Sequence, residues 1–274
     1  MKKNSNVDIF IYSHIPFHPI QNDHVFKVLT NSHAEAKEFN TDLEIFRDYT
    51  GRNISKENLM YNEYAGFYWL WKNYELKDYV GLNHYRRVYN CYNELPDFNE
   101  IFKTKKIILN EAINLVGNPG TGRRIYNNRD WYAEWHNVED FDLLGEIIKS
   151  NYPQYADGFD KMSKVTFLHP SSLFTMPKDL FIEYCEFIFP CLQDIRDEMG
   201  FFTTEDCIAH VEKNKDKYIK DRHELYDVRY QSRIIGYLAE RALGSFLMSG
   251  DNSLEDNAEI FKWSMVPEEL YKSE

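Results

Sequence analysis

The feature that most constrains the fold is a long apolar helix followed at once by a short apolar strand. From Ser55 to about Lys77, large apolar residues recur at three- and four-residue spacing, which predicts a helix with one wide buried face. Ser55 is the expected N-cap. The next residues, 78–82, form an apolar run that is typical of a central parallel strand. This helix–strand unit indicates an α/β fold.

Further elements are predicted along the chain. Residues 7–13 are apolar and β-branched and predict a first strand, which Pro16 and Pro19 end. We expect one α/β domain at 1–250, with a mixed, mostly parallel sheet flanked by helices, and an acidic tail at 251–274 packed on or near the surface. The other expected strands lie at 107–109, 112–116, 166–168 and 173–176, the last two as a pair or one bent strand, and the expected helices at 138–150, 177–199 (with a kink or break at Pro190) and 230–248.

The charge of the chain argues against a nucleic-acid partner, and its hydropathy argues against a membrane span or a signal peptide. The chain has 32 Lys and Arg against 44 Asp and Glu, a net charge of −12. Proteins that wrap nucleic acid gain most of their affinity from neutralised phosphates, so a nucleic-acid partner is not expected. No apolar window is long enough to cross a bilayer, and the run after residue 6 contains Asp8 and is too short for a signal peptide. We therefore expect a cytoplasmic protein whose cysteines (Cys91, Cys185, Cys191, Cys207) stay reduced.

A concentrated group of cations follows the strand at 78–82. Asn83, His84, Arg86 and Arg87 would emerge together where that buried strand ends. Arginine presents paired donors that match phosphate oxygens, and histidine adds a donor or an acid/base group. The group therefore predicts a diphosphate clamp. The alternative is that both arginines pair with acids on the surface.

Two loops and one helical carboxylate are further candidates for nucleotide-sugar binding. Ser13 and His14 follow the first strand, where open α/β folds place ligands. In the loop from Asp48 to Asn53, Gly51 allows a ligand to approach the backbone closely. Glu63 falls near the apolar stripe of the expected helix, and a buried carboxylate requires a partner.

Several common catalytic motifs are absent. The sequence contains no P-loop, no GxGxxG, no HExxH and no GxSxG. The histidines and cysteines are not at zinc spacing. No Asp-x-Asp stands at a strand end, so we do not predict a divalent metal and expect Arg and His to neutralise the diphosphate.

A resemblance to a known family lies in three segments, 53–55, 62–73 and 78–87, and in two later ones, 180–189 and 235–241. Its pattern is roughly D-N-x-G-x-N-I-S, E-L-T-A-x-Y-W-x-W-K-N and D-Y-x-G-L-x-H-Y-R-R, and two later segments match F-x-x-Y-C-x-W-x-F and x-G-Y-x-x-E-R. The chain resembles a bacterial family of capsular-polysaccharide and O-antigen proteins, long described only as a domain of unknown function. The chain differs from the family's usual residues at Arg52, Ala65, Gly66 and Phe187.

The resemblance implies a glycosyltransferase of GT-A-like architecture, with members that transfer galactofuranose from a UDP-sugar. The residues His84–Arg87 would stand where ordinary GT-A enzymes have a metal-binding Asp-x-Asp. We expect a nucleotide-sugar donor, with UDP favoured, and a glycan or lipid-linked glycan acceptor at the inner face of the cytoplasmic membrane.

Candidate roles for the remaining residues complete the hypothesis. Glu240 is the candidate base for the acceptor hydroxyl, with Glu205 or Asp206 in reserve. His84, Arg86 and Arg87 would stabilise the departing diphosphate. Two alternatives stay open: a non-catalytic nucleotide- or glycan-binding subunit of a polysaccharide-assembly complex, and a hydrolase with paired carboxylates. The aromatic residues expected to shape the acceptor groove are Trp131, Tyr132 and Trp135.

Overall fold

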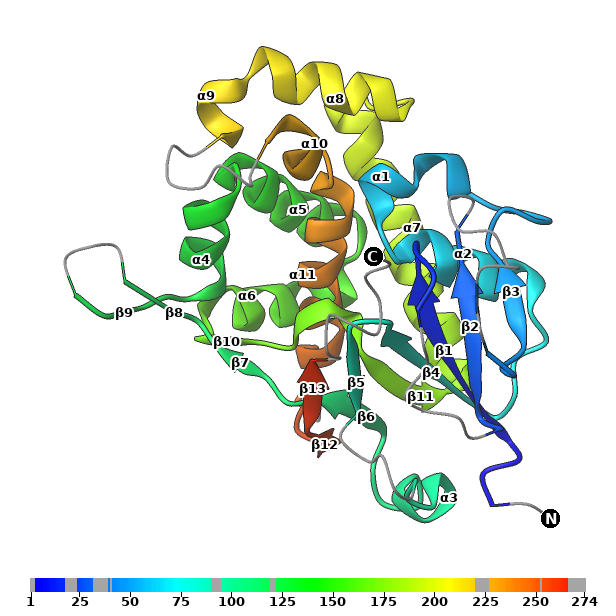
Figure 1. The fold of residues 1–274 in the computed structure, drawn as a ribbon. Helices are drawn as coiled ribbons and strands as arrows, with labels where there is room; N and C mark the ends of the chain where they lie inside the picture. Colours follow the sequence, from blue (N-terminus) through cyan, green and yellow to red (C-terminus); the bar gives the residue numbers. More distant parts are fainter. Residues whose placement is uncertain are drawn as a thin grey trace.

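The computed structural model describes residues 3–17, 24–31, 39, 41–89, 95–118, 122–219, 227–251 and 253–265. Within these residues the chain forms an α/β fold around a mixed sheet flanked by helices, as expected (Figure 1). The strands of the main sheet are β1 (Val7–Ser13), β2 (Phe26–Thr30), β3 (Ile45–Arg47), β4 (Tyr79–His84), β5 (Arg87–Tyr89), β6 (Ile107–Asn110), β11 (Phe174–Pro177), β12 (Ala258–Phe261) and β13 (Trp263–Met265).

The order of the strands is β12-β6-β11-β4-β1-β2-β3, with β5 paired to β4 and β13 to β5. The segment β4-β1-β2-β3 is parallel, whereas β11 runs antiparallel to its neighbours β4 and β6. Minor sheets pair β7 (Ile113–Asn114) with β10 (Phe167–Leu168) and β8 (Val116–Gly117) with β9 (Arg124–Ile125). The expected strands at 166–168 and 173–176 therefore belong to different sheets.

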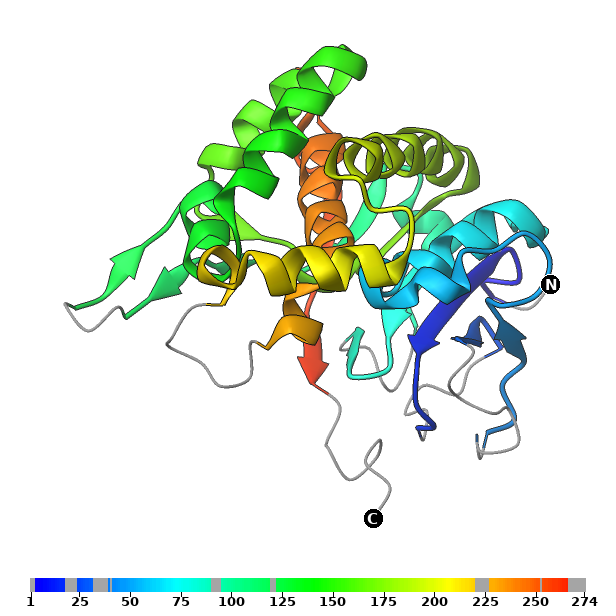
Figure 2. The same cartoon turned by 90° about the horizontal axis from the view of Figure 1, so that it is seen from above.

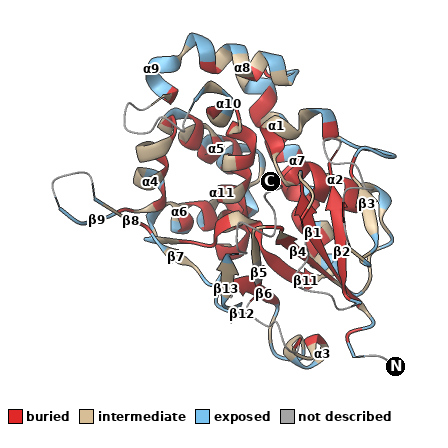
Figure 3. Cartoon of the chain, viewed as in Figure 1, coloured by how far each residue is buried: buried red, intermediate tan, exposed pale blue. Residues whose placement is uncertain are grey.

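Both faces of the sheet are covered, which explains why β1 is apolar throughout and fully buried (Figure 3). Val7, Ile9 and Ile11 pack in one core cluster, and Phe10 and Tyr12 pack in the other, as the alternation of a strand requires. The larger cluster lies between the sheet and the helices.

Most of the helices gather around α11 (Ile234–Met248) on one side of the sheet (Figure 2), whereas α3 (Phe98–Ile101) packs against the opposite face. The helix α11 packs against α6 (Ala156–Lys164), α7 (Lys178–Met199) and α1 (Asn58–Tyr61). The helix α7 continues through Pro190, so the expected break there is wrong. The remaining helices are α2 (Tyr64–Asn73), α4 (Asn128–Trp135), α5 (Val138–Asn151), α8 (Thr204–Lys213), α9 (Lys215–Tyr218) and α10 (Val228–Gln231), with 3-10 turns η2 (Ser55–Glu57), η3 (Pro153–Tyr155) and η4 (Pro170–Ser172).

Two expected helices are divided. The helix expected from Ser55 to Lys77 is split into η2, α1 and α2, and the helix expected at 230–248 is split into α10 and α11. The hydroxyl of Ser55 does not cap a helix but donates a hydrogen bond to Asp48 at 2.6 Å.

The expected domain boundary at residue 250 is wrong. Within residues 251–274, β12 pairs in parallel with β6, and β13 pairs with β5. Both strands complete the main sheet, so the domain continues past residue 250. Cys185, Cys191 and Cys207 are buried thiols without disulfides, and Cys91 lies outside the described residues. In the described part of the chain, no helix combines the length and apolar character needed to cross a membrane.

Candidate functional site

A cavity of about 950 Å³ opens where β1 and β4 end. Tyr12 and His84 stand opposite each other in the register of these two strands, and both line the cavity. Its facing walls come from α1 and from α10–α11. The carboxyl ends of parallel strands are where open α/β sheets bind ligands, so this is the expected place for a site.

The cations predicted from the sequence are brought together here. His84, Arg86 and Arg87 all line the cavity. Among the described residues, no carboxylate forms an ion pair with Arg86 or Arg87, and the Nε atom of each is buried without a hydrogen-bond acceptor. Both guanidinium groups therefore retain donors that could bind an anion. Asn83, by contrast, is buried in β4 and is not part of the cavity lining.

A tight turn between β4 and β5 produces this placement. His84 pairs with Arg87, so only Tyr85 and Arg86 form the connection. The ring of Tyr85 is buried and packs edge-on against His14 at 5.3 Å between ring centroids. The buried tyrosine anchors the turn from which Arg86 and Arg87 extend.

The positive charge of the turn is unfavourable in the protein alone. Burial lowers the pKa of His84 well below its ordinary value, and Arg86, Arg87 and His14 lower it further. Burial and the neighbouring Arg86 also lower the pKa of Arg87. The Nδ1 atom of His84 accepts a hydrogen bond from the backbone N–H of Arg86 at 3.1 Å, as a neutral imidazole can. A bound anion would relieve this repulsion between like charges.

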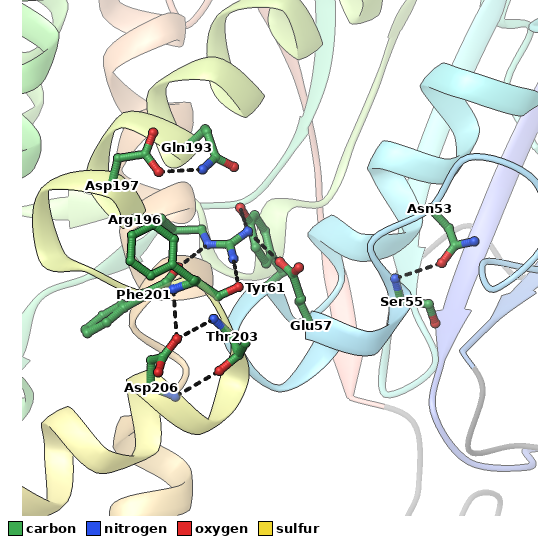
Figure 4. Close-up of polar contacts among 11 residues, drawn as sticks. Asn53, Ser55, Glu57, Tyr61, Gln193, Arg196, Asp197, Phe201, Thr203 and Asp206 are labelled. Atoms are coloured by element: carbon green, nitrogen blue, oxygen red, sulfur yellow. Dashed lines mark hydrogen bonds and ion pairs between the residues drawn. The ribbon is translucent and has the colours of Figure 1, made fainter.

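The loop from Asp48 to Asn53 supports the cavity from outside. Asp48 is fully buried and accepts hydrogen bonds from the hydroxyls of Tyr12, at 3.1 Å, and Ser55. Gly51 has a φ of 55° and lies so close to Asn73 that a side chain there would meet its amide. The amide of Asn53 donates to the carbonyl of Gly51 at 2.9 Å, and its Oδ1 accepts from the backbone of Ser55 (Figure 4).

Asp48, Gly51 and Asn53 are not among the residues that line the cavity. After β1, His14 lines it, whereas the hydroxyl of Ser13 is buried and bonds to the backbone of Ile15. Sequence reasoning placed these loops beside the site, but it did not separate residues that border the cavity from residues that hold them.

The two acidic side chains of the cavity differ in their contacts. Glu240 accepts a hydrogen bond from the backbone N–H of Ser171 at 2.6 Å, and its other oxygen forms an ion pair with Arg241. Glu63 lines the cavity, and no other described residue donates a hydrogen bond or forms an ion pair to its carboxylate. The reserve candidates lie elsewhere: Asp206 caps α8 in a capping box with Thr203 (Figure 4), and Glu205 follows Thr204 in the same helix.

Aromatic side chains form another part of the cavity wall. Trp131 and Trp135 of α4 line the cavity, as the acceptor hypothesis requires, but Tyr132 is fully buried behind them and is not part of the lining. His136 and Tyr237 stack with ring centroids 4.1 Å apart, and both border the same space. Flat apolar surfaces of this kind suit a sugar ring.

Several lining residues were missed from the sequence. Tyr12, Asn58 and His136 lie outside the segments that carry the resemblance to a family or stand out as a motif, and they come from three elements that are distant in the chain. Their common signal is only that a polar or aromatic residue stands near the end of a strand or helix.

The break between α1 and α2 places Glu63 at the cavity. Asn62 has a φ of 52°, which ends α1 and lets α2 begin after Glu63. Asn62 packs directly on Gly236 of α11, where an added Cβ would lie 2.3 Å from the Nδ2 atom and 3.3 Å from the Cβ atom of Asn62.

Gly236→Ala is therefore expected to destabilise the protein. Alanine would gain up to about 1 kcal/mol from helix propensity, but displacing Asn62 in a packed interface costs about 1–3 kcal/mol. Urea unfolding followed by circular dichroism measures the difference. Gly244→Ala in the same helix is the matched control, because its Cβ would meet flexible Met162. Equal stability of the Gly236→Ala variant and the unsubstituted protein would contradict this account of the break.

The described residues contain no group of side chains with the arrangement of a metal site. Within the described residues, no three His, Cys, Asp or Glu side chains are grouped as metal ligands would be. The expectation that the diphosphate is neutralised without a divalent metal stays a prediction from the sequence.

The chain is similar to known proteins at the level of fold. No curated protein matches its sequence. A solved apo structure of the bifunctional glycosyltransferase WbbM is 22% identical, with a TM-score of 0.66 over 95% of this chain. This chain spans 45% of that one. The structure of the mannosyltransferase Ktr4p from S. cerevisiae is 10% identical, with a TM-score of only 0.37. That comparison covers 95% of this chain and 71% of Ktr4p.

The family is established by a sequence model. The model described as a domain of unknown function, DUF4422, matches residues 8–212, three quarters of the 274 residues. The match contains all but the first residue of β1, the whole of β4 and the turn that carries Arg86 and Arg87. The chain is therefore a member of the DUF4422 family.

Proposed function

We propose that this protein is a glycosyltransferase that uses a nucleoside diphosphate sugar as donor. The observation that carries the proposal is the pair of guanidinium groups of Arg86 and Arg87, which border a large cavity at the strand ends without a carboxylate partner among the described residues. Guanidinium donors match the oxygens of a diphosphate. The fold shared with the bifunctional glycosyltransferase WbbM supports the same activity.

In the proposed reaction, the cationic turn stabilises the leaving group. The bond between the anomeric carbon and the diphosphate oxygen breaks, and the electron pair stays on that oxygen. Arg86 and Arg87 would neutralise the charge that develops there, and neutral His84 would donate a hydrogen bond through Nε2. The acceptor hydroxyl forms the new bond to the anomeric carbon and loses its proton. The Trp131 and Trp135 wall would hold the acceptor sugar.

The finer parts of the proposal concern the donor and the pathway. We propose a UDP-sugar donor carrying galactofuranose or another hexose, and a glycan or lipid-linked glycan acceptor in the synthesis of capsule, O-antigen or another surface polysaccharide. These rest on the resemblance of the motifs at 62–73 and 78–87. Location in the cytoplasm, at the inner face of the membrane, belongs to the same proposal.

A panel of UDP-, GDP-, CMP- and dTDP-sugars tests the activity. The purified protein is expected to be protected against thermal unfolding by one nucleotide class, as any ligand that binds the folded state protects it. It is also expected to release the free nucleotide slowly from the matching sugar. Protection without release, even with glycan acceptors present, would favour the non-catalytic binding subunit instead. Release of sugar from a glycan without any nucleotide would favour a hydrolase.

A further inference from the structure

We propose that Glu63, rather than Glu240, is the base that takes the proton from the acceptor hydroxyl. This inference rests on the proposed glycosyltransferase function and assigns one step of it. Glu63 and Glu240 are the acidic side chains that border the cavity in the described part of the chain, so the comparison between them decides the assignment.

The contacts of the two carboxylates are the first argument. Both oxygens of Glu240 are already engaged, one by the backbone N–H of Ser171 and one by Arg241. Ser171 itself has a left-handed φ of 65°, so Glu240 holds an irregular turn in place. A carboxylate with this structural role has little capacity left for a substrate. Glu63 has no hydrogen bond or ion pair from another described residue, and apart from a hydrogen bond from its own backbone N–H its carboxylate has lone pairs left for a substrate.

The position of Glu63 is the second argument. It lies at the break between α1 and α2, on the cavity wall that Tyr12 and Asn58 continue. Its charged neighbours come from two other elements: Arg87 at the start of β5, and Arg233 and Glu240 at and within α11. The carboxylate therefore borders the cavity that contains both the cationic turn, where the diphosphate would leave, and the aromatic wall, where the acceptor would bind. A base for the incoming hydroxyl has to lie between these two.

Electrostatics agrees with the position. The pKa of Glu63 is raised to about 7: burial and the nearby Glu240 raise it, while a hydrogen bond from its own backbone N–H, Arg87 and Arg233 lower it. A general base is most effective when its pKa lies near the working pH, because it is then ionised and still able to accept a proton. An ordinary surface glutamate would be too weakly basic.

The proposed step balances as follows. A lone pair of the acceptor hydroxyl oxygen forms the bond to the anomeric carbon while the bond from that carbon to the diphosphate oxygen breaks. The hydroxyl proton passes to an oxygen of Glu63, and the leaving electron pair stays on the diphosphate, beside Arg86 and Arg87. A single displacement of this kind inverts the anomeric configuration, because the new bond forms on the face of the carbon opposite to the bond that breaks.

Glu63→Gln is the direct test, with turnover, UDP affinity and pH dependence measured on the same protein. Loss of a general base lowers turnover by about 10²- to 10⁴-fold, while the UDP dissociation constant should change by less than about threefold. Turnover of the unsubstituted protein should rise with pH through about 7, as Glu63 loses its proton, and Glu63→Gln should abolish this limb. Glu63→Asp keeps a carboxylate and should retain the limb with intermediate turnover.

Asp140→Asn is the matched control. Burial also raises the pKa of Asp140 to about 7, but this carboxylate accepts a hydrogen bond from Tyr218 and does not line the cavity. An asparagine oxygen can accept the same bond, so the variant should keep both turnover and the limb. A limb lost in Asp140→Asn and kept in Glu63→Gln would overturn the proposal.

Other outcomes separate this inference from the function on which it rests. If Glu63→Gln loses UDP affinity and turnover in parallel, Glu63 binds the donor and is not the base. If Glu63→Gln keeps full turnover while Glu240→Gln loses it with UDP affinity intact, the base is Glu240. If the unsubstituted protein neither binds a nucleotide nor releases one, the proposed function itself fails, whatever the variants do.

Discussion

Replacing both Arg86 and Arg87 with alanine is expected to reduce UDP affinity by about 100-fold or more. Hydrogen bonds to charged groups contribute about 1.5–3 kcal/mol each, so the loss of two charged donor groups removes about 3–6 kcal/mol. The fold should tolerate the change, because neither guanidinium has an ion-pair partner in the described structure and the two raise each other's electrostatic cost. Isothermal titration calorimetry with UDP measures the affinity, and the thermal midpoint should stay within about 2 °C.

Arg129→Ala is the control for this experiment. Arg129 forms an exposed ion pair with Asp142, at 2.6 Å, on a surface that is not part of the cavity lining. Its loss should leave UDP affinity unchanged and cost at most about 1 kcal/mol of stability. UDP affinity that survives in the Arg86→Ala, Arg87→Ala double variant would mean that the cationic turn does not bind the diphosphate.

Replacing Arg196 with alanine is expected to destabilise the protein by about 3–5 kcal/mol, because it breaks a buried ion pair and leaves its partners unsatisfied. The guanidinium of Arg196 pairs with Glu57 at 2.5 Å and donates to the carbonyl of Phe201 at 2.9 Å (Figure 4). It also donates to the carbonyl of Phe202 at 2.9 Å. It thereby joins the end of α7 to the turn that precedes α1, and α1 forms a wall of the cavity.

Urea unfolding followed by circular dichroism measures the Arg196→Ala effect. Arg196→Lys is the informative comparison: it keeps the charge but cannot reproduce the fork of donors, and we expect a loss between those of the alanine variant and the unsubstituted protein. Gln193→Ala removes an exposed hydrogen bond to Asp197 in the same helix and should change stability by less than about 0.5 kcal/mol. A loss below about 1 kcal/mol for Arg196→Ala would show that this contact does not hold α1 in place.

Local patterns were sufficient to predict the centre of the fold. The strand at 7–13 is observed as β1 with the same bounds, and the helix expected at 138–150 is α5, capped by Asn137 as expected. Both follow from apolar periodicity and capping, which depend on neighbouring residues only.

The errors have tertiary causes. The break at Asn62 has no proline or glycine to announce it and depends on the close approach of Gly236, far away in sequence. The strands β12 and β13 lie in an acidic segment, and they form because β6 and β5 offer unpaired edges. Neither cause is visible in a local window of sequence.

Only part of the candidate site was predictable from the sequence. The turn at 84–87 was found because its cations are adjacent in sequence and follow a buried strand. The cavity residues of α10 and α11, such as Tyr230 and Tyr237, approach that turn only after the chain folds. Glu63 and Glu240 both stood out from the sequence, but only their contacts separate a carboxylate that holds a turn from one that remains available.

Calorimetry of UDP binding to the unsubstituted protein, with excess EDTA and then with added Mg²⁺ or Mn²⁺, tests the central claim most directly. The claim is that arginine side chains, and not a divalent cation, neutralise the diphosphate at the end of β4. We expect UDP to bind in EDTA with an affinity that added metal changes by less than about threefold. Binding that appears only when metal is added would contradict the claim.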